Sequence, residues 1–264
     1  MYIKKTMFML VSALILSLML ISCKGEARMD KSKGVGKLLE SIEYNAYEYN
    51  ASRRMRYDEQ NRIKGIVLLV NEYEVFSAMD ITYHKDGSIS VYDHETFYEV
   101  DFTRKGNTIT IVENESTYPA EILTINKSGF ITKRESLGEG DGGWRRTTNY
   151  QYQNGNPIKV TTETLMKGTD TKTEVIENFK FDDKISPFYS CNTPRWLLQF
   201  FGFSRNLGLK NNVVEYQNPN SNGGQPNIYN YEYDSYGYLY KSTASGTDDD
   251  GNECPTVTTY IYGE

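Results

Sequence analysis

The residue with the most specific chemistry in this sequence is Cys23. Two lysines precede an apolar run from Met7 to Ile21, and Leu20-Ile21-Ser22-Cys23 closes that run. The run is too short to span a bilayer as a helix but has the length of an export-signal core. Aliphatic and small residues directly before a cysteine mark a site where the thiol forms a thioether to a lipid before cleavage. We therefore expect residues 1–22 to be a cleaved signal and Cys23 to carry the lipid. The alternative is an uncleaved anchor helix with an incidental cysteine.

A lipid on Cys23 would place the chain in the cell envelope. Two or more acyl chains anchor a protein stably, whereas a single chain does so only marginally. Residues 24–37 are polar and contain glycine, as expected for a solvated tether. Lys24 stands where an inner-membrane retention signal would have aspartate, so we expect the anchor to lie in the outer membrane. Glu26 and Asp30 are too sparse for a surface-export signal, which leaves the face of that membrane open.

Acid–base and metal chemistry would depend on two histidines, His84 and His94, which lie in or near expected turns. The sequence His94-Glu95 lacks a third ligand at the spacing of a metal site. No Gly-x-Ser-x-Gly elbow occurs, although residue order alone leaves a Ser-His-Asp triad open. We therefore expect no catalytic residue, no metal site and no cofactor, and hydrolase activity is the weakest alternative.

Two loop-like clusters could bind ions. Asp248–Glu253 is the densest acidic segment, but aligning Gly251 with the glycine of a calcium loop puts Gly246 and Val257 at ligand positions. That motif therefore fails, and the segment is expected to be a solvated hairpin tip. Gly138–Gly143 is rich in glycine but precedes a strand rather than a helix, so it is expected to be a loop and not a phosphate site.

Two cysteines remain once Cys23 is acylated. Cys191 and Cys254 would form a disulfide in the oxidising envelope if their Cα atoms lay within about 7 Å of each other. Otherwise both are small, unpaired core residues. The sequence leaves these two interpretations open.

An aromatic segment is the remaining candidate site. Thr193 is a plausible N-cap, Pro194 fits the first helical position, and apolar residues at helical spacing predict a short helix over 194–201. This helix either plugs the core or lines a site for an apolar ligand, and plugging is favoured because aromatic residues at this spacing usually pack. The candidate ligand-contacting residues are Trp196, Phe200, Phe201 and Phe203.

A recurring turn organises the rest of the chain. An aromatic or aliphatic residue is followed by a short polar turn with Gly, Asn or Asp and then by another apolar residue, as in β-hairpins. Most successive turns are about 20–30 residues apart, the period of two strands. The predicted turns are Tyr57–Ile63, Tyr83–Ile89, Phe102–Ile109, Ile125–Ile131, Tyr152–Ile158, Phe181–Ile185 and Tyr233–Leu239.

Between the turns, apolar and polar residues alternate with period two. Tyr229, Tyr231 and Tyr233, for example, share one face of their strand. We count roughly 13–15 strands, nearly all in hairpins. A sheet of that size curls or closes, so we predict an all-β fold: a large antiparallel meander forming a strongly curved sheet or barrel. Residues 38–264 are expected to form this single domain.

The stretch 179–240 resembles a family of Bacteroides-type bacterial lipoproteins of unknown function described as having a porin-like fold. The resemblance implies a lipid-anchored, curved antiparallel sheet or barrel in water, with no catalytic residues to carry over. The matching segments are Phe181–Phe188, the predicted helix, Leu209–Val213, Tyr231–Asp234 and Gly237–Leu239.

Charge narrows the function classes. The net charge of −6 and pI of about 5.2 argue against nucleic acid as a partner. Charged residues such as Arg145 and Arg146 occur on both strand parities, which argues against a lipid-facing barrel surface. We expect an envelope protein that binds or scaffolds a protein or glycan partner. The alternative is a carrier of a small apolar or glycan ligand inside the curved sheet.

Overall fold

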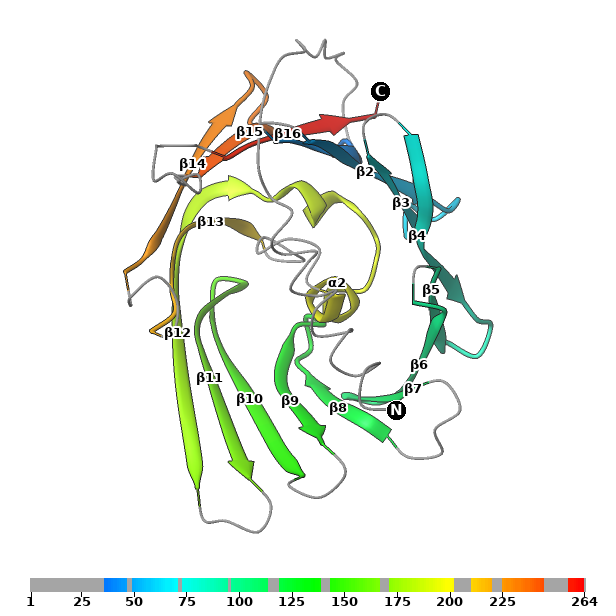
Figure 1. Ribbon diagram of the computed structural model, residues 1–264, viewed down its shortest axis with the longest axis vertical. Coiled ribbons are helices and arrows are strands. Elements are labelled where there is room, and N and C mark those ends of the chain that lie inside the picture. Colours follow the sequence, from blue (N-terminus) through cyan, green and yellow to red (C-terminus); the bar gives the residue numbers. More distant parts are fainter. Residues whose placement is uncertain are drawn as a thin grey trace.

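The chain folds into one closed antiparallel β-barrel around a short helix, as the computed structural model shows (Figure 1). The structure describes residues 36–46, 49–70, 73–94, 96–113, 119–138, 143–166, 171–201, 210–219, 225–244 and 256–263. Within these ranges there are sixteen strands. Their bounds are β1 Leu39–Ala46, β2 Tyr49–Tyr57, β3 Ile63–Val70, β4 Tyr73–Tyr83, β5 Ile89–Asp93, β6 Tyr98–Lys105, β7 Thr108–Glu113, β8 Pro119–Ile125, β9 Ile131–Leu137, β10 Trp144–Gln153, β11 Asn156–Met166, β12 Lys172–Ile185, β13 Asn211–Gln217, β14 Asn227–Tyr233, β15 Leu239–Ala244 and β16 Thr256–Tyr262.

Each strand pairs with its sequence neighbours, and the first strand closes the barrel against the last. The register of this seam runs from Leu39 opposite Tyr262 to Asn45 opposite Val257. Next to the seam, the N–H of Gly263 donates to the carbonyl of Leu38 over 3.0 Å. The predicted all-β fold, an antiparallel meander curved into a barrel with one short helix, is confirmed.

The barrel has two different ends. Connections from even- to odd-numbered strands are short turns, except for the β12–β13 connection, and they define the turn end. The other connections define the loop end. Four turns share one pattern. In each, the first residue of the turn forms two backbone hydrogen bonds, and the fourth residue has a positive φ. Those residues are Asn61, Gly87, Gly129 and Gly237. In three of the four, an Asp or Asn oxygen also accepts two backbone N–H groups, as in Asp58, Asn126 and Asp234.

Tyrosines clamp the turn end. The hydroxyl of Tyr83, the last residue of β4, donates over 2.9 Å to the carbonyl of Ile63, the first residue of β3. Tyr57 and Tyr262 make the same contact from the last residues of β2 and β16, and Tyr152 makes it from the residue before the last of β10. This arrangement explains why an aromatic residue opens so many of the predicted turns.

One predicted turn is wrong. Residues Phe181–Ile185 belong to β12, where they produce a break in register against β13. The chain turns only after β12, through the 3₁₀-helix η1 (Pro187–Ser190) and the helix α2 (Arg195–Phe201). The local Asp–Lys signal resembles a turn because Asp182 accepts the N–H of Lys184, two residues on, over 3.0 Å.

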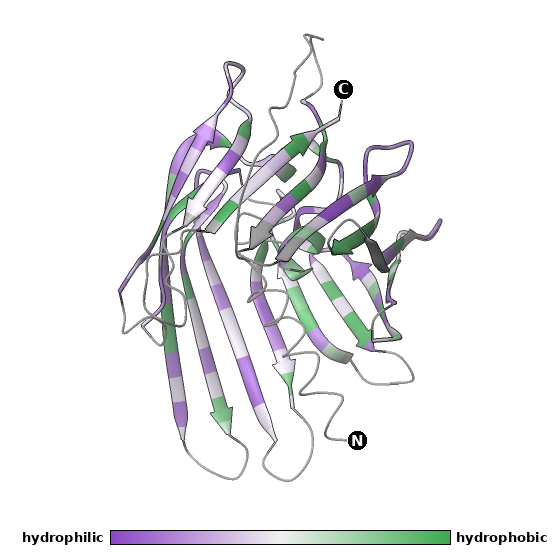
Figure 2. Cartoon of the chain, turned by 45° about the horizontal axis from the view of Figure 1, so that its top comes forward, coloured by the Kyte–Doolittle hydropathy of each residue, from purple (hydrophilic) through white to green (hydrophobic). Residues whose placement is uncertain are grey.

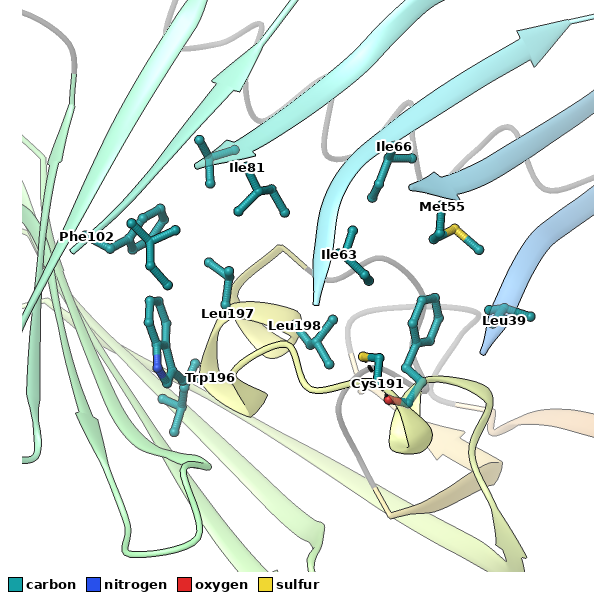
Figure 3. Packing of buried hydrophobic residues seen from close by; sticks show 14 of the residues in the cluster. Leu39, Met55, Ile63, Ile66, Ile81, Phe102, Cys191, Trp196, Leu197 and Leu198 are labelled. Carbon is teal, nitrogen blue, oxygen red and sulfur yellow. Dashed lines mark hydrogen bonds between the residues drawn. The ribbon is translucent and has the colours of Figure 1, made fainter. Parts of the chain in front are cut away.

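Apolar and polar residues alternate along the strands (Figure 2). Towards the turn end the inward residues are apolar, and they pack on α2, which lies in the middle of the ring of strands (Figure 1). Figure 3 shows Trp196, Leu197 and Leu198 of α2 beside Ile63, Ile81 and Phe102 of the wall. None of the described helices is long and apolar enough to cross a membrane.

Candidate binding site inside the barrel

The segment from η1 to α2 closes the turn end and is fixed by specific hydrogen bonds. The N–H of Ile63, the first residue of β3, donates a hydrogen bond to Oγ1 of Thr193 over 2.7 Å. The N–H of Ile131, at the start of β9, donates to Oε1 of Gln199 over 2.9 Å. Helix α2 begins at Arg195, and the carbonyl of Pro194 accepts its first hydrogen bonds. The helix predicted over 194–201 is therefore found, one residue shorter.

The aromatic candidates lie on this helix. Trp196 is only 4 % exposed, and its ring centre is 5.4 Å from that of Phe102. Phe200 and Phe201 are half-buried and also contact Phe102, with centroids 5.2 and 5.8 Å away. Phe203 lies outside the described residues. Three of the four candidates therefore pack together against the wall, and their binding of a ligand stays a prediction.

Beyond this apolar half, towards the loop end, the inner face becomes polar. Residues directly opposite each other on paired strands share one face of the sheet. A polar residue directly opposite a buried residue of the inner face therefore also points into the barrel. The pairs are Val100 with Glu113, Ile111 with Glu121, Leu123 with Arg134, and Val160 with both Tyr150 and Glu177. We call these five polar residues, together with the inward Tyr98, the polar layer.

An arginine–carboxylate pair is at the centre of the polar layer. Arg134 meets both carboxylate oxygens of Glu121, each over 2.6 Å. Desolvation opposes the charge of Arg134, but Glu121 outweighs it and raises the pKa of the guanidinium. The guanidinium also lies 4.8 Å from the ring centre of Phe200. The polar layer therefore rests directly on the end of helix α2.

Tyrosine–carboxylate contacts flank this pair on both sides. Burial, and then a hydrogen bond to Glu113, raises the pKa of the Tyr98 hydroxyl, which is thus a neutral donor. On β12, Oε1 of Glu177 accepts from the Tyr216 hydroxyl and from Nδ2 of Asn218, the latter over 3.1 Å. Tyr150 lies between the two sides: burial raises the pKa of its hydroxyl, and the charges of Arg134, Glu177 and Glu121 act on it as well. The members of the layer thus come from strands between β6 and β13.

The side chains of the polar layer are partly exposed to solvent. Arg134 lies deep inside the barrel, yet 32 % of its side chain is exposed, and 17 % of Glu121 is exposed. Tyr98, Tyr150 and Glu177 are also half-buried rather than buried. Apolar residues on the same strands, such as Leu123, are fully buried. The inner face therefore has a packed half and a half that is open to solvent.

The histidines lie away from this layer. Nε2 of His84 is 2.8 Å from Oγ of Ser90, and that hydroxyl donates to Asp101 over 2.5 Å. A hydrolytic triad requires the histidine between serine and aspartate, and here the serine is central. His94 instead contacts Asp80 over 2.7 Å. Among the described residues, no group of three His, Cys, Asp or Glu side chains is placed to hold a metal ion.

Of the three cysteines, only Cys191 lies within the described residues. Cys191 is buried as a thiol that donates to the carbonyl of Phe188 over 3.2 Å, and burial raises its pKa. Cys254 lies outside the described residues, so the disulfide stays a prediction. Cys23, the signal and Asp248–Glu253 also lie outside them, as does the centre of the glycine-rich loop at 139–142.

The polar layer was missed at the level of sequence, although a signal for it exists. Charged residues on both parities of a strand mean that both faces of the sheet are polar. Arg145 points outward to Glu135, whereas Arg146 points inward, where its side chain contacts Thr164 and the Trp144 ring. The same signal in β9 marks Arg134 as inward once Leu123 is known to be core.

Fold and site together define a closed antiparallel barrel with an internal helix and a polar, solvent-exposed inner layer. No family model matches the chain, and no curated protein matches it. One solved structure with a similar fold is a porin-like protein from Bacteroides uniformis, at 10 % sequence identity. The match covers 85 % of this chain and 96 % of that one, with a TM-score of 0.45. Membership of the lipoprotein family stays a prediction.

Proposed function

We propose that this chain is a lipid-anchored protein of the bacterial outer membrane that binds a ligand inside its barrel without catalysing a reaction. The observation that carries the binding role is the division of the inner face. Helix α2 fills the half at the turn end, while the polar layer in the other half is partly solvent-exposed. A purely structural barrel has no need of a layer of charged and hydroxyl groups on the solvent-exposed part of its inner face.

The outer face supports a barrel that stands in water. Exposed ion pairs join neighbouring strands around it at N–O distances of 2.6–2.8 Å. A charge at the centre of a lipid-facing strand costs about 2–4 kcal/mol, so such pairs favour an aqueous surface. The pairs are Arg145–Glu135, Lys172–Glu163, Lys180–Glu215 and Lys241–Glu232.

Lipid attachment is tested by labelling cells with an alkyne-bearing fatty acid. We expect the label on the wild-type chain and on Cys191→Ser, and we expect Cys23→Ser to lose it and leave the membrane fraction. A label that survives in Cys23→Ser would contradict the anchor.

Ligand binding is tested by native mass spectrometry of the full chain, released gently from its own membrane. We expect a mass in excess of the lipidated chain. A mass equal to the lipidated chain, together with stable capture of an envelope protein, would instead favour a scaffolding role.

A further inference from the structure

We infer that the polar layer binds a neutral, polyhydroxylated ligand, an oligosaccharide. This inference rests on the proposed binding function and names the class of ligand for the same site. Three properties of the layer lead to it: its charge, its pattern of donors and acceptors, and the state of the apolar half below it.

The charges of the layer disfavour an anion. Glu113, Glu121 and Glu177 bring three carboxylates to one region of the inner face. Arg134 is already committed to Glu121 through both carboxylate oxygens, and Arg146 contacts Thr164 and Trp144. An anionic ligand would have to break the Arg134–Glu121 pair and would then lie beside the unpaired Glu121 carboxylate, where the two negative charges repel each other.

The donor and acceptor pattern suits hydroxyl groups. Both hydrogen bonds that reach Glu177 end on Oε1, which leaves Oε2 as an acceptor among the described residues. A carboxylate has about four acceptor positions, and a tyrosine hydroxyl both donates and accepts. Sugar hydroxyls likewise donate and accept, so adjacent hydroxyls can bridge such groups without disturbing their present partners. Thr148 and Thr162 add a hydroxyl pair 3.1 Å apart on the same inner face.

Aromatic rings border the layer. Phe200 lies beneath Arg134, and the Trp144 ring lies 4.7 Å from the Arg146 guanidinium. A ligand site with few polar anchors and a flat apolar surface is the usual composition for small molecules. These two rings therefore give the layer an apolar border beside its polar groups.

An apolar ligand has no corresponding place. The apolar half is filled by α2, and Leu197 and Leu198 are completely buried. Filling that half a second time would force side chains out of their rotamers. Of the two carrier alternatives that the sequence leaves open, the glycan is therefore the one that the geometry favours.

The experiment is isothermal titration of the full chain in mild detergent with neutral malto-, cello-, xylo- and manno-oligosaccharides of four to seven units. Palmitate and inorganic phosphate are the comparison ligands. We expect saturable binding of at least one oligosaccharide and none of palmitate or phosphate. Glu177→Gln and Tyr98→Phe should each weaken that binding at least about tenfold, because each removes a hydrogen-bonding group from the layer. Glu163→Gln, on the outer face, should leave it unchanged.

The outcomes separate the two proposals. Binding of palmitate or phosphate instead of sugar would overturn the ligand class and keep the binding function. A non-carbohydrate molecule in the native mass spectrum would do the same. Sugar binding that Glu177→Gln and Tyr98→Phe leave unchanged, with unaltered melting temperatures, would overturn the polar layer as the site. The binding function itself fails when no probe binds and the native mass shows no excess.

Discussion

Gln199 and Ile131 form one side of a closed hydrogen-bonded triangle that fixes helix α2 to the barrel wall. The N–H of Ile131 donates to Oε1 of Gln199 over 2.9 Å, and Nε2 of Gln199 donates to the Tyr152 hydroxyl over 2.9 Å. That hydroxyl in turn donates to the carbonyl of Ile131 over 2.6 Å. Ile131 pairs with Ile125 of β8, but the pairing of β9 with β10 begins only at Lys133. Helix α2 therefore supplies the acceptor that β10 does not provide for the Ile131 N–H.

Removing the glutamine amide should destabilise the protein. Gln199→Ala leaves the Ile131 N–H without its acceptor at a part-buried position, so we expect a loss of about 1–3 kcal/mol in the free energy of unfolding. Urea denaturation of the full chain measures this loss. Gln151→Ala, on the exposed face of β10, should change it by less than about 0.5 kcal/mol. Equal effects of the two variants would mean that the triangle contributes nothing to stability.

Helix α2 should contribute to the core in proportion to its burial. Leu197 has no exposed surface, whereas Leu137 is 59 % exposed on the outer face of β9. Leu197→Ala should cost about 2–5 kcal/mol because a cavity remains beside Phe102 and Ile81, and Leu137→Ala should cost far less. Thermal melts of the two variants give the comparison. A Leu197→Ala protein as stable as Leu137→Ala would show that the helix is not packed as described.

The tyrosine clamps should make the protein sensitive to alkali. Burial raises the pKa of Tyr83 to about 12, from an unfolded value of 10.0. Because the raised pKa favours the neutral hydroxyl in the folded state, its stabilisation is complete below pH 10 and is lost between about pH 10 and 12. Tyr83→Phe should cost about 1 kcal/mol at pH 7, since the Ile63 carbonyl loses a donor.

The variant should also show a shallower loss of stability above pH 10 than the wild type. Denaturation at a series of pH values, with Tyr236→Phe at an exposed turn as control, measures both effects. A wild-type stability that stays constant up to pH 12 would contradict the buried, neutral hydroxyl.

The positive-φ glycine of the β4–β5 turn offers a test of backbone strain alone. Gly87 has a φ of 87°, and an added Cβ would meet nothing within 4 Å. Gly87→Ala should therefore cost about 1 kcal/mol through the conformation and not through a clash. Lys85→Ala in the same turn serves as the control, and differential scanning calorimetry compares the two. An unchanged melting temperature for Gly87→Ala would argue for a different turn conformation.

Much of the fold follows from local signals in the sequence. The turn residues Asn61, Gly87, Gly129 and Gly237 define hairpins because few residue types adopt positive φ. Even numbers of strands separate these four turns, which explains why all of them lie at the same end of the barrel. Alternation correctly places Tyr229, Tyr231 and Tyr233 on one face, and register makes that face the inner one.

Other features depend on contacts that are distant in sequence. The count of sixteen strands among the described residues exceeds the predicted 13–15. Thr193 looks like a helix cap, but Ile63, 130 residues away, uses its hydroxyl. Arg134 and Glu121 form a pair only because the fold directs both side chains into the barrel on neighbouring strands. The sequence shows that both faces are polar without showing which charges meet.

The seam between β1 and β16 has a kinetic consequence. Its paired residues, Leu39 and Tyr262 among them, are separated by nearly the whole domain, so closure joins the most distant contacts in the chain. Contacts of such separation form late and slowly in folding. Until they form, both edge strands present unpaired backbone groups that can recruit strands from other chains. A chain arriving segment by segment from a secretion channel would expose the β1 edge first and longest, which makes that edge the place where a holding chaperone would have most effect on yield.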